Sequence, residues 1–160
     1  MRTINIDLDG VLADFYPAAT KVLGVPYKSI EPVQVWGVLE HVDNFFLNLP
    51  LKADARALWD GLQGCGPLRI LTATPKPTRK LATAPADKLT WVRRNFSDTI
   101  PVFVVAHGLR KAELAKRGDI LIDDLKRNID AWELAGGTGI LHTSAADTLK
   151  KLKAVLAKAP

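Results

Sequence analysis

The stretch INIDLDGVLADF, from Ile4 to Phe15, contains the pattern that decides the fold. Its first residues are mostly apolar and predict a short buried β-strand. Asp7 and Asp9 follow two positions apart, and because side chains alternate in direction along a strand, both carboxylates leave the backbone on one side. Gly10 comes next and suits a sharp turn, since glycine adopts backbone angles that other residues resist. Two acids this close repel each other unless a cationic or phosphorylated group lies nearby.

The composition predicts one globular domain with a basic balance. Of the 160 residues, 48% are hydrophobic, yet no apolar run reaches the length of a membrane helix. The net charge of +5 suits acidic partners such as nucleotides, other phosphates or nucleic acid, although most basic residues fit a solvated face. The chain enters a predicted strand at once, without a signal-peptide pattern, and the single Cys65 has no disulfide partner within the chain. We therefore expect a cytoplasmic protein without a membrane partner.

Apolar runs that alternate with helical patterns predict an α/β fold. The runs that read as strands cover residues 3–8, 67–72, 101–106, 119–123 and 138–143. Between the later runs, apolar residues recur at spacings of three and four, which is typical of helices that bury one face. Such an alternation favours right-handed crossovers between parallel strands. We therefore expect a five-stranded parallel sheet with helices on both faces, which is a three-layer, Rossmann-like fold.

The interval between the first two predicted strands is longer than one crossover helix requires. Helices expected at 14–24 and 53–64 leave residues 25–52, which are rich in large apolar side chains and contain proline and glycine. We interpret 25–52 as a small helical cap over the carboxyl edge of the sheet. The remainder, 1–24 and 53–160, would form the core of the same single domain.

Ligands of open parallel sheets bind beyond the carboxyl ends of the strands. The groups expected there are Asp7 and Asp9, then Thr72 and Ala73, then His107 leading to Lys111, then Asp123 and Asp124. Four carboxylates at neighbouring strand ends would destabilise the fold unless a cation balanced them, and Mg²⁺ is the usual choice where phosphate shares the coordination. The Thr72 hydroxyl and the backbone N–H groups after it suit phosphate oxygens. Lys88 or Lys111 could neutralise a phosphoryl group in transfer.

The segment DLDGVLAD (7–14) resembles the DxDGxhxD signature of the haloacid dehalogenase-type phosphatases. ILT (70–72), a lysine, and GDILIDD (118–124) are similar to the other motifs of that superfamily and occur in the same order. More narrowly, NFFLNLPL, LTATPKP, DKLTWVRRNF and AWELAGGTGILHT resemble the 5′(3′)-deoxyribonucleotidase group, and together these pieces span most of the chain.

The resemblance implies a role for each carboxylate. Asp7 would be the nucleophile that forms an aspartyl-phosphate, and Asp9 the general acid and then the general base. Mg²⁺ would be bound by the Asp7 carboxylate, the Asp9 backbone carbonyl and Asp124, with Asp123 alongside or one layer further out.

The resemblance also implies a phosphate site. Thr72 and the Ala73 N–H would hold phosphate, with Gly10 next to them. Lys111 is the better match to the lysine of the third motif, and Lys88 matches another phosphate-contacting lysine of the nucleotidase group.

Substrate choice would then fall to the cap. In the resembling nucleotidases, aromatic side chains stack on the base, an interaction worth ~1–3 kcal/mol per base. Phe15, Phe45 and Phe46 occupy matching places here, and Trp36 is a looser match. The same rings are equally suited to form the core of the cap, and the cap is shorter than the vertebrate-type pattern, so base preference stays open.

The sequence thus predicts a Mg²⁺-dependent phosphatase for a small-molecule phosphate monoester, with deoxyribonucleoside monophosphates first and no obligatory nucleic acid. A homodimer is left open. One alternative is a phosphatase of the same type for another small phosphorylated metabolite or a nucleic-acid end. Another is a non-catalytic nucleotide-binding module, which would not need both Asp7 and Asp9. Simple structural roles are the remaining alternative: a surface turn for the first two aspartates, a helix start for Asp123 and Asp124, and exposed helix positions for the lysines.

Overall fold

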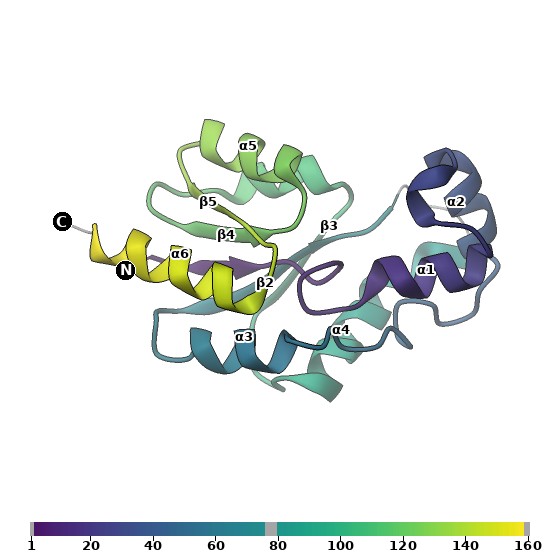
Figure 1. Cartoon of the computed structure of the whole chain (residues 1–160), viewed down its shortest axis with the longest axis horizontal. Coiled ribbons are helices and arrows are strands. Elements are labelled where there is room, and N and C mark those ends of the chain that lie inside the picture. The colour runs from purple at the N-terminus through teal and green to yellow at the C-terminus, as the bar shows by residue number, and fades with distance from the viewer. Residues whose placement is uncertain (1, 76–79, 159–160) are drawn as a thin grey trace.

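The computed structural model describes residues 2–75 and 80–158 and shows a five-stranded parallel sheet (Figure 1). The strand order is β3-β2-β1-β4-β5, with every neighbouring pair parallel. The strands are β1 (Ile4–Ile6), β2 (Leu68–Ala73), β3 (Val102–Val105), β4 (Ile120–Asp123) and β5 (Thr138–Leu141). The predicted fold class is therefore confirmed, although β1 stops at Ile6 and is shorter than the predicted 3–8.

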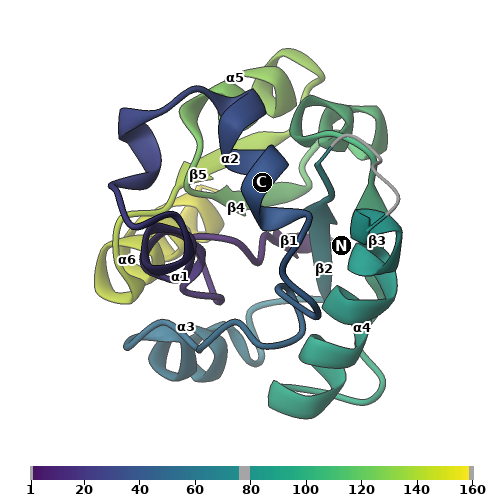
Figure 2. The ribbon, with the colours of Figure 1, turned by 90° about the vertical axis from the view of Figure 1, so that its right-hand side faces the viewer.

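Helices cover both faces of the sheet, so the molecule has three layers (Figures 1 and 2). One face carries α5 (Lys126–Leu134) and the 3-10 helix η3 (Gly108–Leu114), which contact each other. The other face carries α3 (Ala55–Leu62), α4 (Ala84–Asn95) and α6 (Ala145–Ala157). A short 3-10 helix, η2 (Lys80–Thr83), precedes α4. None of the helices in the described part of the chain is long and apolar enough to span a membrane.

Neighbouring residues of a strand bury their side chains on opposite faces, because side chains alternate along a strand. Ile70 lies in the large cluster shared with α3, α4 and α6, whereas Leu71 lies in the cluster formed with Ile129 and Trp132 of α5. Since both faces of the sheet are covered, the central strands β1 and β4 are buried at every position rather than at alternate ones.

The segment between β1 and α3 contains α1 (Phe15–Leu23), the 3-10 helix η1 (Tyr27–Ser29) and α2 (Pro32–Leu39). These elements lie at one end of the molecule, beyond the carboxyl ends of the strands (Figures 1 and 2). Val35 and Leu39 of α2 are buried in the same cluster as Ile6 of β1. The apolar core of this segment is thus continuous with that of the body, and the division into a cap (25–52) and a core stays a prediction.

Candidate active site

The carboxyl ends of β1 and β4 bring three aspartates together. The two strands are neighbours, with Ile6 paired to Ile122, so the residues that follow lie side by side. One carboxylate oxygen from each of Asp7, Asp123 and Asp124 lies within 4.8 Å of the other two. The predicted meeting of acidic groups from the first and fourth strands is therefore present in the structure.

Lys111 is buried between two of these aspartates. Its Nζ lies 2.8 Å from Oδ1 of Asp7 and 2.6 Å from Oδ2 of Asp123. Burial lowers the pKa of the Lys111 ammonium group, but the two carboxylates outweigh that effect and the pKa is raised above its usual value. The ammonium form is therefore maintained inside the protein, where an unpaired charge would be costly.

A second buried lysine, Lys88, forms an ion pair with Asp9. It comes from α4, only 2% of its side chain is exposed, and its Nζ lies 2.6 Å from Oδ2 of Asp9. The same Nζ is 3.3 Å from the Thr72 hydroxyl, at the end of β2, and 4.5 Å from the ring centre of Phe46. Burial raises the pKa of the Asp9 carboxyl group, while the charge of Lys88 opposes the rise. A carboxyl group with a raised pKa is suited to hold and release a proton.

Asp123 has both of its oxygens occupied. In addition to the ion pair with Lys111, it accepts hydrogen bonds from the Leu125 N–H at 2.9 Å and from the Asn128 amide at 3.0 and 3.1 Å. Leu125 is the residue directly before α5, so Asp123 also supports the start of that helix. In this structure Asp123 orients Lys111 rather than offering a free oxygen.

Asp124 is different, because one of its oxygens is buried without a partner. Oδ2 accepts a hydrogen bond of 2.8 Å from the Tyr16 hydroxyl, whereas Oδ1 has no hydrogen-bond partner among the described residues. Burial, and then the charge of Asp7, raise the pKa of Asp124 to about 7. Gly10, at φ +81°, lies against this carboxylate, and a Cβ at Gly10 would overlap it. The backbone can pass here only because residue 10 has no side chain.

The donor set fits a hard divalent cation. Asp9 also has a buried oxygen, Oδ1, without a partner among the described residues. When all four aspartates are ionised, the two buried lysines leave two negative charges unbalanced. Carboxylate oxygens are the ligands that Mg²⁺ prefers, and a divalent cation would restore neutrality. The residues that could hold it are Asp7 and Asp124, which follow the central strands.

The remaining predicted phosphate-binding residues lie at the same edge of the sheet. The side chain of Thr72 is fully buried beside Lys88, and Ala73 is the last residue of β2. The Gly10 N–H donates to the carbonyl of Ala13, so Gly10 contributes a close backbone approach rather than a free donor. The structure thus brings together all the predicted catalytic, metal and phosphate-binding residues; their roles stay predictions.

The predicted base-stacking rings pack on one another. Phe15 lies at the centre, with ring centres at 5.8 Å to Phe45, 6.3 Å to Phe46 and 6.0 Å to Trp36. The three phenylalanines are at most 7% exposed, while Trp36 is partly buried. This arrangement corresponds to the cap-core alternative. Of these rings, Phe46 contacts a site residue, because Nζ of Lys88 lies over its face.

Sequence reasoning missed two residues, Tyr16 and Asn128. Tyr16 donates a hydrogen bond to Asp124, and Asn128 donates to Asp123, the last residue of β4. Asn128 carried a usable signal, because it is a polar residue beside the apolar stripe of a helix that begins at the strand end. Tyr16 directly follows Phe15 in the opening stretch, but nothing in the sequence indicated that its hydroxyl turns towards Asp124.

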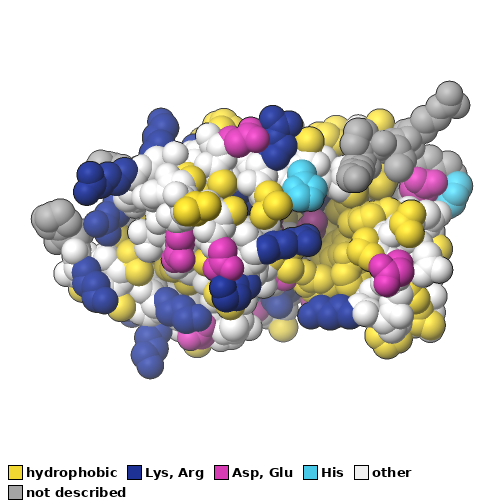
Figure 3. Space-filling view, turned by 90° about the horizontal axis from the view of Figure 1, so that it is seen from above, with side chains coloured by type: hydrophobic (Ala, Val, Ile, Leu, Met, Phe, Trp, Pro, Cys, Tyr) yellow, Lys and Arg dark blue, Asp and Glu magenta, His cyan; other side chains and the backbone are white. Residues whose placement is uncertain are grey.

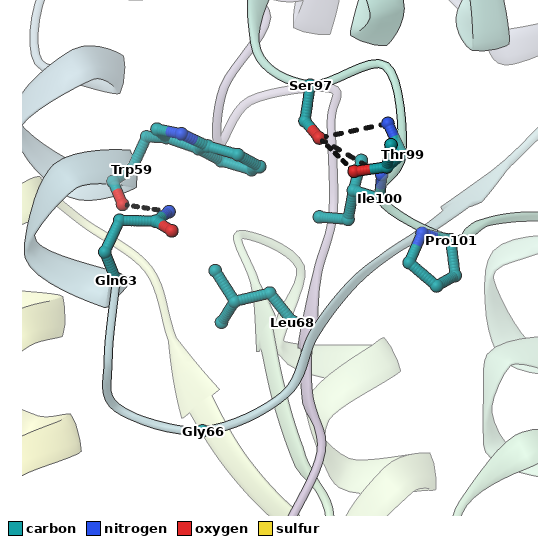
Figure 4. A pocket seen from close by; sticks show the side chains of 8 residues that line it. All are labelled: Trp59, Gln63, Gly66, Leu68, Ser97, Thr99, Ile100 and Pro101. Atoms are coloured by element: carbon teal, nitrogen blue, oxygen red, sulfur yellow. Dashed lines mark hydrogen bonds between the residues drawn. The ribbon is translucent and has the colours of Figure 1, made fainter.

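Two hollows differ in character. An apolar one, bordered by Lys or Arg, His, and Asp or Glu side chains, lies between the body and the end that carries α2 (Figure 3). The other, of about 320 Å³, lies at the opposite edge of the sheet and is lined by uncharged residues (Figure 4). These are Trp59, Gln63, Gly66, Leu68, Ser97, Thr99, Ile100 and Pro101.

No protein-family model and no curated protein matches this sequence. Solved structures are similar to it over nearly its whole length. A hydrolase from Streptococcus pneumoniae has a TM-score of 0.56 at 15% identity and covers 95% of this chain and 98% of its own. A structure described as a haloacid dehalogenase-like hydrolase, from Burkholderia xenovorans, has a TM-score of 0.56 at 12% identity, over 91% of this chain and 84% of its own.

A haloacid dehalogenase-like family hydrolase from Streptococcus pneumoniae has a TM-score of 0.52 at 20% identity, over 98% of this chain and 97% of its own. At these identities the likeness concerns the fold alone. The chain has the Rossmann-like α/β fold of the haloacid dehalogenase-like hydrolases to which it is similar, and the predicted fold is confirmed to that extent.

Proposed function

We propose that this protein is a Mg²⁺-dependent phosphomonoesterase. The observation that carries the proposal is that Asp7 and Asp9, two positions apart, are each paired with a separate buried lysine. The Asp7–Lys111 distance is 2.8 Å and the Asp9–Lys88 distance is 2.6 Å. Two carboxylates with different partners are suited to two different tasks, one as nucleophile and one as acid and base.

In the proposed reaction, a carboxylate oxygen of Asp7 attacks phosphorus and forms an aspartyl-phosphate while the bond to the leaving oxygen breaks. Asp9, whose pKa is raised by burial, gives its proton to that leaving oxygen. Asp9 then takes a proton from a water molecule, whose oxygen attacks the phosphorus of the intermediate. This second step releases inorganic phosphate and restores the Asp7 carboxylate.

The chain's cationic groups would stabilise the phosphoryl oxygens. Lys111 adjoins the nucleophile, and Lys88 lies between Asp9 and the Thr72 hydroxyl, where a phosphate oxygen would be held. Asp7, Asp124 and the Asp9 carbonyl would hold Mg²⁺, which when bound supplies positive charge next to the transferring group.

We propose nucleoside monophosphates, deoxyribonucleotides first, as the substrates. The support is the resemblance of the DKLTWVRRNF and AWELAGGTGILHT segments to the deoxyribonucleotidase group. An apolar hollow with cationic groups on its rim also suits a flat, uncharged base attached to a phosphorylated sugar (Figure 3).

A panel of phosphate esters tests both levels of the proposal. Phosphate release is measured with Mg²⁺ for ribo- and deoxyribonucleoside 5′- and 3′-monophosphates, sugar phosphates and p-nitrophenyl phosphate. The proposal predicts turnover of the aryl ester and higher kcat/KM for deoxyribonucleotides. Equal rates for all esters would contradict the nucleotidase assignment and favour a phosphatase for another metabolite. The absence of turnover with every ester would favour the nucleotide-binding module.

A further inference from the structure

Tyr16 connects the segment after β1 to the candidate cation site. It lies in the first turn of α1, and its hydroxyl donates a hydrogen bond of 2.8 Å to Oδ2 of Asp124. An ionised carboxylate can only accept a hydrogen bond, so the phenol is the donor of this pair.

The hydrogen bond distinguishes the two oxygens of Asp124. Oδ2 is occupied by Tyr16, while Oδ1 is buried and has no partner among the described residues. A carboxylate held at one oxygen has a defined plane, so the direction of its second oxygen is defined too. Gly10 packs against the same oxygen, because a Cβ there would overlap Oδ2 of Asp124 and would lie 2.9 Å from the Tyr16 ring.

We propose that Tyr16 is a positioning residue that holds Asp124 so that Oδ1 is presented to the divalent cation. The inference rests on the cation site of the proposed function. Hydrogen-bond partners of metal ligands orient those ligands, and removing one commonly weakens metal binding by ~10–100-fold.

The position of Tyr16 is itself set by its neighbours. Its ring packs edge-on against Phe15 at 5.4 Å and against Tyr27 of η1 at 5.2 Å, and Nζ of Lys28 lies 5.9 Å from its centre. The packing of the segment beyond β1 therefore reaches the carboxylate after β4 through one aromatic ring. It follows that Tyr16 links the order of that segment to cation affinity.

The test compares Tyr16→Phe with Tyr27→Phe. Both changes remove one phenolic hydroxyl and keep the ring, but the Tyr27 hydroxyl has no hydrogen-bond partner among the residues that the structure describes. Mg²⁺ alone is titrated into each full-length protein by calorimetry, without substrate, and circular dichroism verifies that each is folded. We expect the dissociation constant for Mg²⁺ to rise about 10-fold in Tyr16→Phe and to change less than about 2-fold in Tyr27→Phe.

Hydrolysis of p-nitrophenyl phosphate gives a second readout. In Tyr16→Phe, the Mg²⁺ concentration for half-maximal rate should rise by a similar factor, while kcat at saturating Mg²⁺ should stay within about 3-fold of wild type. Unchanged or tighter Mg²⁺ binding by Tyr16→Phe would overturn the inference. Equal weakening by both variants would also overturn it, because ring packing rather than the hydrogen bond would then be responsible.

The inference and the proposed function fail in different ways. If the wild-type protein binds Mg²⁺ and Tyr16→Phe weakens that binding, but no ester is hydrolysed, the positioning role stands and the phosphatase proposal does not. If the wild-type protein hydrolyses esters with Mg²⁺ and Tyr16→Phe binds the cation normally, the reverse holds. A wild-type protein that binds no Mg²⁺ overturns both.

Discussion

The two edges of the parallel sheet differ in how their polar groups are satisfied. At the edge opposite the site, the hollow of about 320 Å³ contains polar groups that bond to near neighbours: the Gln63 amide donates to the Trp59 carbonyl, and the Ser97 hydroxyl accepts from the Ile100 N–H (Figure 4). At the carboxyl edge, buried carboxylates face buried lysines, and Asp9 and Asp124 each have an oxygen without a partner among the described residues.

The comparison shows that a concave surface alone does not identify a functional site. Burying ionic groups is costly, and a fold does not need several of them at one place for its own stability. The buried ionic groups lie at the carboxyl edge of the sheet, and this is the edge to which ligands of open α/β sheets bind. Unbalanced buried charge is therefore a better guide here than the volume of a hollow.

The largest expected difference between the edges is in activity. Asp7→Asn replaces the nucleophile by an amide of the same shape, and we expect hydrolysis of p-nitrophenyl phosphate with Mg²⁺ to fall by about 10⁴-fold or more. Gln63→Ala, in the opposite hollow, should leave the rate within about 2-fold, because it touches none of the reacting groups. If Asp7→Asn kept a tenth of the wild-type rate, Asp7 would not be the nucleophile.

Replacing one buried and one exposed lysine tests how much the buried charges at the carboxyl edge contribute to stability. Lys111→Met leaves Asp7 and Asp123 buried without their cation, so we expect the free energy of unfolding to fall by about 3–5 kcal/mol. Lys126→Met removes an exposed ion pair with Asp130 and should cost no more than about 1 kcal/mol. Urea unfolding of both variants gives the numbers. Equal losses would mean that the buried charges at the carboxyl edge are not special.

The pH dependence of the free energy of unfolding should reveal the raised pKa of Asp124. Its pKa is about 7 in the folded protein against an ordinary aspartate value of 3.8, so between these values the folded state holds a proton that the unfolded state has lost. The contribution of Asp124 to stability therefore decreases as pH rises from about 4 to about 7. Urea unfolding with a chelator present should show wild type losing stability relative to Asp124→Asn across that window. Parallel curves for the two proteins would contradict the raised pKa.

The smallest expected effect is a difference in stability and Mg²⁺ binding between two Gly→Ala variants. Both glycines have a left-handed backbone conformation. Gly10 and Gly24 have φ values of +81° and +71°, so alanine is strained at both and should cost about 1 kcal/mol. Only at Gly10 would the added Cβ meet Asp124; at Gly24 there is nothing within 4 Å. Gly10→Ala should therefore cost more stability than Gly24→Ala and should weaken Mg²⁺ binding, as thermal unfolding and calorimetry would show. Identical behaviour would place Asp124 away from Gly10.

The parallel sheet and the proximity of the aspartates could both be predicted from the sequence, for a physical reason. Apolar runs separated by helical patterns define a parallel sheet, and the carboxyl ends of parallel strands share one edge. Asp7 and Asp123 therefore had to lie close together once β1 and β4 were neighbours. Both lysines were candidates, but their pairing was not predictable, because it depends on how η3 and α4 pack against the sheet.

The side-chain contacts around the site could not be predicted from the sequence. Phe15, Phe45 and Phe46 read equally as base platform or apolar core, and only packing could show that each ring is covered by the others. Tyr16 was missed because neighbouring helix residues point in different directions, and its direction depends on where α1 begins after the turn at Gly10.

The most direct test of the central claim is a crystal structure of the protein grown with Mg²⁺ and beryllium fluoride, which imitates a phosphoryl group bonded to a carboxylate. We predict a fluoroberyllate group on Asp7, with its fluorine atoms near Lys111 and Thr72, and a cation bound by Asp7 and Asp124. A fluoroberyllate and cation bound elsewhere, or a carboxyl edge that binds neither at saturating concentrations, would contradict the account.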